Sequence, residues 1–188
     1  MRLLFKKDLI ESFVQRCAEL IQDVAEEKVA IVGVKSGGFF LAKRIHSFLE
    51  GKGKDILIGA LDITFWRDDI SRNPYPIVRG TEINFSIDDI PLFLVDDVIY
   101  TGRTTRAALC EIFDYGRPTY VKFFSLVNRV GREIPIHPDF FSFHIKLSEN
   151  ELLEVILREK GFSFDCGVAV ERGEKISDED LQKLLNVS

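Results

Sequence analysis

The stretch Leu94–Thr105, with the sequence LVDDVIYTGRTT, decides which fold this chain is expected to adopt. It runs from an apolar segment through two acidic residues, Asp96 and Asp97, into a turn of small and hydroxyl-bearing residues. A helical pattern then begins at Thr104. Carboxylates bind the hydroxyls of a ribose, and the free N–H groups at a helix start bind phosphate. The order of these groups therefore predicts a sugar-phosphate site where a strand passes into a helix.

The residues on either side predict that strand and that helix. Pro91–Val95 is a continuous apolar run, as expected of a strand buried on both faces. The helical pattern that follows is expected to end at Gly116, with Pro118 just beyond it. First-turn N–H groups have no partner inside a helix and carry partial positive charge. The predicted phosphate ligands are the residues of this turn: Thr101, Gly102, Arg103, Thr104 and Thr105.

The rest of the chain alternates strands with helices. Helical periodicity predicts helices at about Asp8–Glu27 and Phe40–Leu49. Short apolar runs predict further strands at Val29–Val34, Ile56–Thr64, Tyr120–Val127 and Cys166–Val170. Such alternation predicts an α/β fold, with a mostly parallel sheet covered by helices on both faces. We expect a single domain spanning 1–188, since the length suits one domain.

Two further predictions concern the C-terminal part. Glu151–Lys160 has the pattern of a helix, and Ser177 is expected to be the N-cap of a last helix. The long segment Trp66–Asp89 lacks clear periodicity, and connections of that length usually serve function or fold into a hairpin.

Composition narrows the functional classes. A net charge of −5 gives no global attraction to nucleic acid, although a local basic patch remains compatible with it. The three cysteines are widely spaced, which predicts reduced, buried thiols rather than a disulfide framework or a zinc site. We find no signal peptide and no apolar run long enough to span a membrane, so a cytoplasmic enzyme without a membrane partner is expected. Some of the sixteen phenylalanines are expected to face a partner subunit.

A second anion site is predicted near residue 35. Lys35, Ser36, Gly37 and Gly38 follow the predicted strand Val29–Val34 and precede a helix, so they also place free N–H groups at a helix start. Two such sites at neighbouring strand ends suit a ligand with two phosphate groups. Arg67, farther along the chain, is either a clamp for one of these groups or a solvated side chain.

The run from Val95 to Thr105 resembles the phosphoribosyl pyrophosphate (PRPP) signature of type I phosphoribosyltransferases. Three more blocks resemble the PyrR family, whose members are pyrimidine-operon attenuation regulators and uracil phosphoribosyltransferases. These blocks are Leu61–Ile70 (LDITFWRDDI), Gly116–Pro118 (GRP) and Leu126–Ile136 (LVNRVGREIPI). The resemblance covers about residues 29 to 140. It implies the type I phosphoribosyltransferase fold, with a mobile loop or hairpin and a small hood.

The resemblance also implies a role for each block. Asp96 and Asp97 would hold the ribose hydroxyls, the Thr101–Thr105 turn the 5′-phosphate, and Lys35–Gly38 the pyrophosphate. Arg67 would act in catalysis from the mobile loop, together with Asp68 and Asp69, and Arg129 would lie near the base. Mg²⁺ would bind through PRPP oxygens and water, with help from Asp96 and Asp97 rather than from a dedicated protein site. The family implies a homodimer or a higher homo-oligomer.

The chain departs from the family in three places. Ser36-Gly37-Gly38 stands where Thr-Arg-Gly is usual, and Asn128-Arg129-Val130-Gly131-Arg132-Glu133 stands where Asp-Arg-Gly-His-Arg-Glu is usual. The first change removes a guanidinium that could contact phosphate or RNA, and the second alters the loop beside the base. The segment Phe140–Asp165 does not follow the family and is expected to contain an extra helix.

These observations leave three functions open. The first is transfer of phosphoribose from PRPP to uracil, giving UMP and pyrophosphate. The second is transfer of phosphoribose to hypoxanthine or guanine, with an aromatic side chain stacked over the base. Such aromatic side chains more often pack in the core than bind a base. The third is an attenuator with little catalysis, which senses a nucleoside monophosphate and binds an mRNA leader through a local basic face. The aromatic candidates are Phe140, Phe141 and Phe143, and the basic candidates are Arg117, Arg129, Arg132, His137 and His144.

Overall fold

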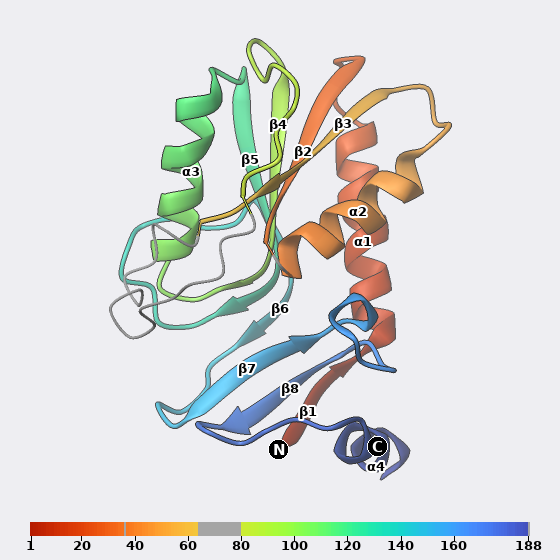
Figure 1. Cartoon of the computed structure of the whole chain (residues 1–188), viewed down its shortest axis with the longest axis vertical. Helices are drawn as coiled ribbons and strands as arrows, with labels where there is room; N and C mark the ends of the chain where they lie inside the picture. Colours follow the sequence, from red (N-terminus) through yellow and green to blue (C-terminus); the bar gives the residue numbers. More distant parts are fainter. Residues whose placement is uncertain (36, 64–79, 188) are drawn as a thin grey trace.

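A parallel sheet forms the centre of the molecule (Figure 1). The computed structural model describes residues 1–35, 37–63 and 80–187. All neighbouring strands of this sheet pair in parallel, so their carboxyl ends lie at one edge. The strands, in spatial order, are β3 (Asp55–Leu61), β2 (Lys28–Val34), β4 (Pro91–Ile99), β5 (Tyr120–Arg129) and β6 (Phe140–Ile145).

Helices cover both faces of this sheet. Helices α1 (Lys7–Gln22) and α2 (Gly37–Leu49) pack on one face, where their apolar residues meet odd-numbered residues of β4 such as Phe93. Helix α3 (Arg103–Tyr115) packs on the other face against even-numbered residues such as Leu94. Side chains alternate along a strand, so β4 serves both cores and is apolar throughout its first half.

A second, smaller sheet joins the two ends of the chain. Its antiparallel strands are β1 (Arg2–Lys6), β8 (Cys166–Glu171) and β7 (Glu151–Ile156), in that spatial order. Helix α4 (Asp178–Val187) packs its Leu181 into the core of this sheet. We call β1, β7, β8, α4 and the single-turn 3-10 helix η3 (Arg158–Lys160) the hood. Figure 1 shows it below the carboxyl edge of the central sheet.

The α/β prediction is confirmed, and so is the N-cap at Ser177, whose hydroxyl oxygen accepts the Asp180 N–H at 3.2 Å. The prediction of a helix at Glu151–Lys160 is wrong, because its first six residues form β7. Leu153 and Val155 face the main core, whereas Leu152 and Ile156 face the hood core. A strand that is apolar on both faces has no period of two, which explains the misassignment.

Several boundaries also differ from expectation. Strand β4 continues through Asp96 and Asp97 to Ile99, so the acidic pair belongs to the strand rather than to the loop. Helix α2 already begins at Gly37, and α1 ends at Gln22 because the chain turns there toward β2. Segment 140–165 contains β6, β7 and η3, and no extra α-helix lies in it.

Two smaller predictions have mixed outcomes. Cys17 and Cys166 are buried and reduced as expected, but Cys110 is exposed, since it lies on the outer side of α3. Of the aromatic candidates, Phe140 stacks on Phe13 with ring centroids 5.8 Å apart, and Phe143 packs against the same core, so both are structural. Within residues 1–35, 37–63 and 80–187, no helix has both the length and the apolar character needed to cross a bilayer.

Candidate active site

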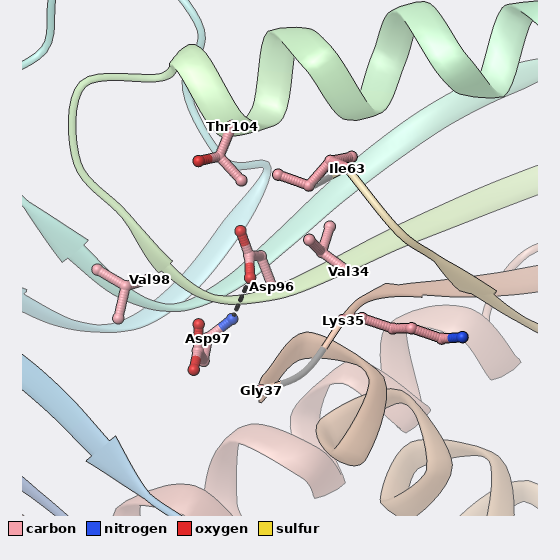
Figure 2. Close-up of a pocket in the computed structure, with 8 residues that line it drawn as sticks. All are labelled: Val34, Lys35, Gly37, Ile63, Asp96, Asp97, Val98 and Thr104. Carbon is pink, nitrogen blue, oxygen red and sulfur yellow. Dashed lines mark hydrogen bonds between the residues drawn. The ribbon is translucent and has the colours of Figure 1, made fainter. Parts of the chain in front are cut away.

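The acidic pair lies at the carboxyl end of the central strand β4. Adjacent strand residues point to opposite faces, and Figure 2 shows the two carboxylates turned to opposite sides. Asp96 points toward Thr104 at the start of α3, and Asp97 points toward Gly37 at the start of α2. The Asp97 N–H donates to an Asp96 carboxylate oxygen at 2.9 Å. The strand thus presents one carboxylate to each of two helix N-termini.

Two glycines bring α2 unusually close to β4. A Cβ atom on Gly38 would lie 2.3 Å from the carbonyl oxygen of Val95 and 2.8 Å from the Cα of Asp96. A Cβ on Gly37 would lie 1.8 Å from Asp97 Oδ2. Neither position tolerates a side chain without movement, because real Cβ atoms do not approach other atoms so closely. The first turn of α2 therefore rests directly on the acidic end of β4.

The turn before α3 is the predicted 5′-phosphate loop, and its shape depends on Gly102 and on contacts with the β5–β6 connection. Gly102, with φ 93°, lies in the left-handed region that favours glycine. The carbonyl of Thr101 accepts the N–H groups of Glu133 at 2.9 Å and Ile134 at 3.0 Å, so the β5–β6 connection supports the turn from behind. The first-turn N–H groups of α3 remain at the open end of the helix.

Side chains of the predicted 5′-phosphate loop differ in accessibility. Thr104 lines the cavity described below, and Thr101 is half-buried with its hydroxyl oxygen accepting the Arg103 N–H at 3.3 Å. Arg103 also donates to Glu133 at 2.7 Å. Thr105 is only 1 % exposed and belongs to the packing of α3 against the sheet. Of the predicted hydroxyl ligands, Thr101 and Thr104 are thus better placed than Thr105.

A cavity of about 280 Å³ lies between the two helix starts (Figure 2). Carboxylates, helix starts and apolar side chains all contribute to its wall. The lining residues are Val34, Lys35, Gly37, Ile63, Asp96, Asp97, Val98 and Thr104. The structure thus brings the acidic pair, the predicted pyrophosphate segment and the predicted 5′-phosphate loop into one cavity.

The ammonium group of Lys35 is turned away from the acidic pair in Figure 2. It donates to the Gly80 carbonyl and to Glu82 Oε1, each at 2.5 Å. Its backbone N–H donates to Leu61 O at 2.8 Å. The backbone of Lys35 therefore lies at the cavity, whereas the charge of its ammonium group is neutralised by Glu82, which lies outside the cavity.

Burial and repulsion dominate the electrostatics of Asp96. This residue is 6 % exposed, and its burial raises the pKa of the carboxyl well above the usual value. The neighbouring charge of Asp97 raises the pKa further, while the Asp97 N–H and the ammonium of Lys160 oppose the shift. A buried carboxyl group with a strongly raised pKa that lines a cavity is typical of a functional site.

Lys160 contacts the acidic pair, and sequence reasoning missed it. It lies in η3 of the hood, and its ammonium donates to Asp97 Oδ2 at 3.2 Å and to the Val155 carbonyl at 2.9 Å. Lys160 and Asp97 are 63 positions apart, and Lys160 belongs to the segment that departs from the family pattern, so no motif signals the contact.

Arg129, predicted to lie near the base, is buried at 7 % exposure. Its guanidinium stacks on the Tyr100 ring at 4.2 Å and donates to the Glu151 carbonyl at 3.1 Å. Arg132 donates to Asn128 Oδ1 at 2.6 Å and to the Tyr100 carbonyl. Arg129 thus holds the end of β5 to Tyr100 and to β7, and Arg132 fixes the loop after β5, so both guanidinium groups are engaged within the protein. The family usually has an aspartate at position 128, and the side-chain oxygen of Asn128 still accepts a hydrogen bond from Arg132.

Four predicted site residues lie outside the described part of the chain: Ser36, Arg67, Asp68 and Asp69. Among the residues that are described, no cluster of three or more histidine, cysteine or acidic side chains is arranged to hold a metal ion.

Comparison with known proteins agrees with this geometry. The phosphoribosyl transferase domain model matches residues 8–155. The Bifunctional protein PyrR of Syntrophobacter fumaroxidans is 45% identical over 155 residues, which cover 80% of this chain and 83% of that protein. The PyrR protein of Nitrosococcus oceani is 44% identical over 140 residues, covering 72% and 78% respectively. The chain belongs to the PyrR family of phosphoribosyltransferases.

Solved structures give the same fold at lower sequence similarity. A hypoxanthine-guanine phosphoribosyltransferase from Bacillus anthracis matches with a TM-score of 0.63 at 18% identity, over 77% of this chain and 84% of that one. A hypoxanthine phosphoribosyltransferase from Trypanosoma cruzi matches with a TM-score of 0.63 at 17% identity, over 81% and 83%. At such identities the likeness shows the type I phosphoribosyltransferase fold and carries no information on the base.

Proposed function

We propose that this PyrR-family protein transfers phosphoribose from PRPP to uracil and releases pyrophosphate. The observation that carries the proposal is the cavity in which the acidic end of β4 meets the first turns of α2 and α3. PRPP has a ribose between two phosphate-bearing ends, and this cavity has carboxylates between two anion-binding helix starts. The PyrR relatives, rather than the geometry, favour uracil over a purine.

Each half of PRPP has a binding element in this proposal. The turn from Thr101 to Thr104 and the first N–H groups of α3 bind the 5′-phosphate. The backbone from Lys35 to Gly38 binds the pyrophosphate at the start of α2. Asp96 and Asp97 accept hydrogen bonds from the ribose hydroxyls. Arg67, Asp68 and Asp69, which lie outside the described residues, are proposed to act on the pyrophosphate, as the family resemblance implies.

The reaction exchanges one bond at the anomeric carbon of the ribose for another. The bond to the pyrophosphate oxygen breaks and the oxygen keeps the electron pair, a ring nitrogen of the base forms the new bond, and that nitrogen gives its proton to the departing pyrophosphate or to water. Positive charge develops on the ribose in between, so the protein's task is to orient the base and stabilise the departing anion. No protein nucleophile is needed.

Mg²⁺ is the proposed cofactor and fits the donor set that is present. Asp96 and Asp97 supply hard oxygen donors, but two carboxylates are too few for a complete protein site, which suits an ion that keeps water and PRPP oxygens as ligands. When bound, Mg²⁺ neutralises charge on the pyrophosphate. Asp96 and Asp97 would then orient its waters as well as the ribose.

A competition between bases tests the proposal. Purified protein is given PRPP, Mg²⁺ and radiolabelled uracil, hypoxanthine or guanine in parallel, and the nucleoside monophosphate is counted. We expect UMP from the wild type and none above background from Asp97→Asn. Formation of IMP or GMP without UMP would favour the purine alternative. Undiminished turnover by Asp97→Asn would remove the role of that carboxylate.

We propose a second activity, regulation through an mRNA leader, because the two relatives reported above are named bifunctional. The predicted basic face is smaller than expected: Arg129 is buried, whereas Arg117, His137 and His144 are exposed. Binding to a pyrimidine-operon leader, measured at low salt with and without UMP, tests this activity. Binding that responds to UMP supports it, and no binding at low salt rejects it.

A further inference from the structure

An ion pair connects the hood to the sugar-phosphate cavity. The ammonium of Lys160 lies 3.2 Å from Asp97 Oδ2, and the Val155 carbonyl accepts another of its hydrogen bonds at 2.9 Å. The side chains are 22% and 21% exposed, so both partners are largely withdrawn from water. The Val155 carbonyl belongs to the end of β7, so Lys160 is held by its own segment in a position that reaches Asp97.

The carboxylate of Asp97 also lies in close contact with the start of α2. The space that a Gly37 Cβ would take lies 1.8 Å from Asp97 Oδ2 and 2.4 Å from its Cγ. An anion is favoured beside a helix N-terminus, because the first-turn N–H groups carry partial positive charge. Asp97 therefore lies at the helix end that the proposed function assigns to the pyrophosphate of PRPP, with Lys160 on its other side.

We propose that Lys160 is a positioning residue that holds Asp97 against Gly37 in the ligand-free protein, so that PRPP must break the Lys160–Asp97 contact in order to bind. This inference rests on the proposed function, since it takes Asp97 and the start of α2 as parts of the PRPP site. Gly37 makes the arrangement sterically feasible, and the hood supplies the cation. PRPP binding is thereby coupled to the position of η3.

The affinity for PRPP tests this inference. Competition between Lys160 and PRPP for Asp97 predicts that Lys160→Met raises the affinity, whereas simple attraction of the ligand by Lys160 predicts that it lowers the affinity. If Lys160 only attracted an anionic ligand, Lys160→Met would weaken PRPP binding. If Lys160 competes with the ligand for Asp97, the same variant tightens binding, by roughly three- to tenfold for a partly buried ion pair. We expect the tighter binding in calorimetric titrations with Mg²⁺-PRPP, and a matching fall in the KM for PRPP with the KM for the base unchanged.

Two variants serve as controls. Lys160→Arg keeps a cation that can pair with Asp97, so its PRPP affinity should stay near that of the wild type. Lys175→Met removes the same charge from an exposed position of the C-terminal segment, and it should leave the affinity unchanged or slightly lower. Thermal melting of each variant checks that the fold is retained.

A fourth variant, Gly37→Ala, acts on the Lys160–Asp97 contact without changing the charge of the protein. In Gly37→Ala the new methyl group cannot coexist with the present position of Asp97. We expect the Lys160 ammonium signal, seen by ¹⁵N NMR in cold, mildly acidic buffer and assigned with Lys160→Arg, to be visible in the wild type. It should be lost in Gly37→Ala, and in the wild type when Mg²⁺-PRPP is added.

The outcomes separate this inference from the proposed function. If neither the wild type nor any variant binds PRPP, the proposed function fails. If the wild type binds PRPP but Lys160→Met binds it equally or more weakly, the PRPP site stands and the positioning role of Lys160 is overturned. Persistence of the Lys160 signal in the PRPP complex would overturn it as well.

Discussion

At the scale of single residues, Asp96 and Asp97 are neighbours in sequence with different surroundings. Asp96 is buried on the α3 side of β4, whereas Asp97 lies on the α2 side with Lys160 as its partner. The sequence motif identified both residues, because two acids before a hydroxyl-rich turn form a local pattern. It did not distinguish their roles, since the partner of Asp97 comes from a distant segment.

The buried charge of Asp96 should reduce stability, and Asp96→Asn should raise it. The folded-state pKa of Asp96 lies above its unfolded value, so folding favours the neutral form. The cost of burying the charge is absent below about pH 4, grows as pH rises through the interval between the two pKa values, and is then constant. We expect Asp96→Asn to increase the free energy of unfolding at pH 7.

Urea titrations at pH 7 and at pH 3.5 measure this difference. The increase in the free energy of unfolding should be much smaller at pH 3.5, where Asp96 is protonated in the folded state and mostly protonated in the unfolded state. Asp114→Asn, at an exposed position of α3, is the matched control and should have little effect at either pH. A destabilised Asp96→Asn at pH 7 would show that the charged form of Asp96 is stabilised by the fold.

The three cysteines should differ in reactivity. Burial raises the pKa of the Cys17 thiol, and it raises the pKa of Cys166 to about 11, so both remain protonated and shielded at pH 8. Cys110 is exposed on α3. We expect a thiol-specific reagent to label one cysteine rapidly in the native protein and three after denaturation. Rapid labelling of Cys17 in the native state would contradict the packing of α1.

At the scale of elements, local pattern predicted the parallel strands and the helices that cover them. It predicted neither β1 nor β6, and it misassigned β7. Strand β1 has five residues and pairs with β8 from the far end of the chain, so its identity depends on a contact that no local window contains. Strand β7 is apolar on both faces because it lies between two cores.

The packing of α1 provides a test at this scale. Phe13 is fully buried and stacks on Phe140 of β6, so Phe13→Ala should leave a cavity. We expect a loss of about 3–5 kcal/mol in the free energy of unfolding. Phe113→Ala is the matched control, because Phe113 on α3 is 56% exposed, and its effect should stay within about 0.5 kcal/mol. Chemical denaturation measures both, and equal losses would contradict the assigned packing.

At the scale of the whole molecule, the hood brings the two ends of the chain to the edge where the cavity lies. Its strands come from residues 2–6 and 151–171, and its η3 carries Lys160 to Asp97. The sequence predicted which segments meet at the cavity, since both segments proposed to bind phosphate follow buried strands and precede helices. The contribution of the hood was not predictable, because it depends on pairing between distant strands.

The central claim is that the acidic end of β4, between the starts of α2 and α3, binds the ribose of PRPP. Calorimetric titration of the protein with Mg²⁺-PRPP tests it most directly. We predict saturable binding of one PRPP per chain and an affinity at least about tenfold weaker in Asp96→Asn, whose fold is expected to be more stable than that of the wild type. No binding of Mg²⁺-PRPP to the wild type, or unchanged affinity in Asp96→Asn, would contradict the account.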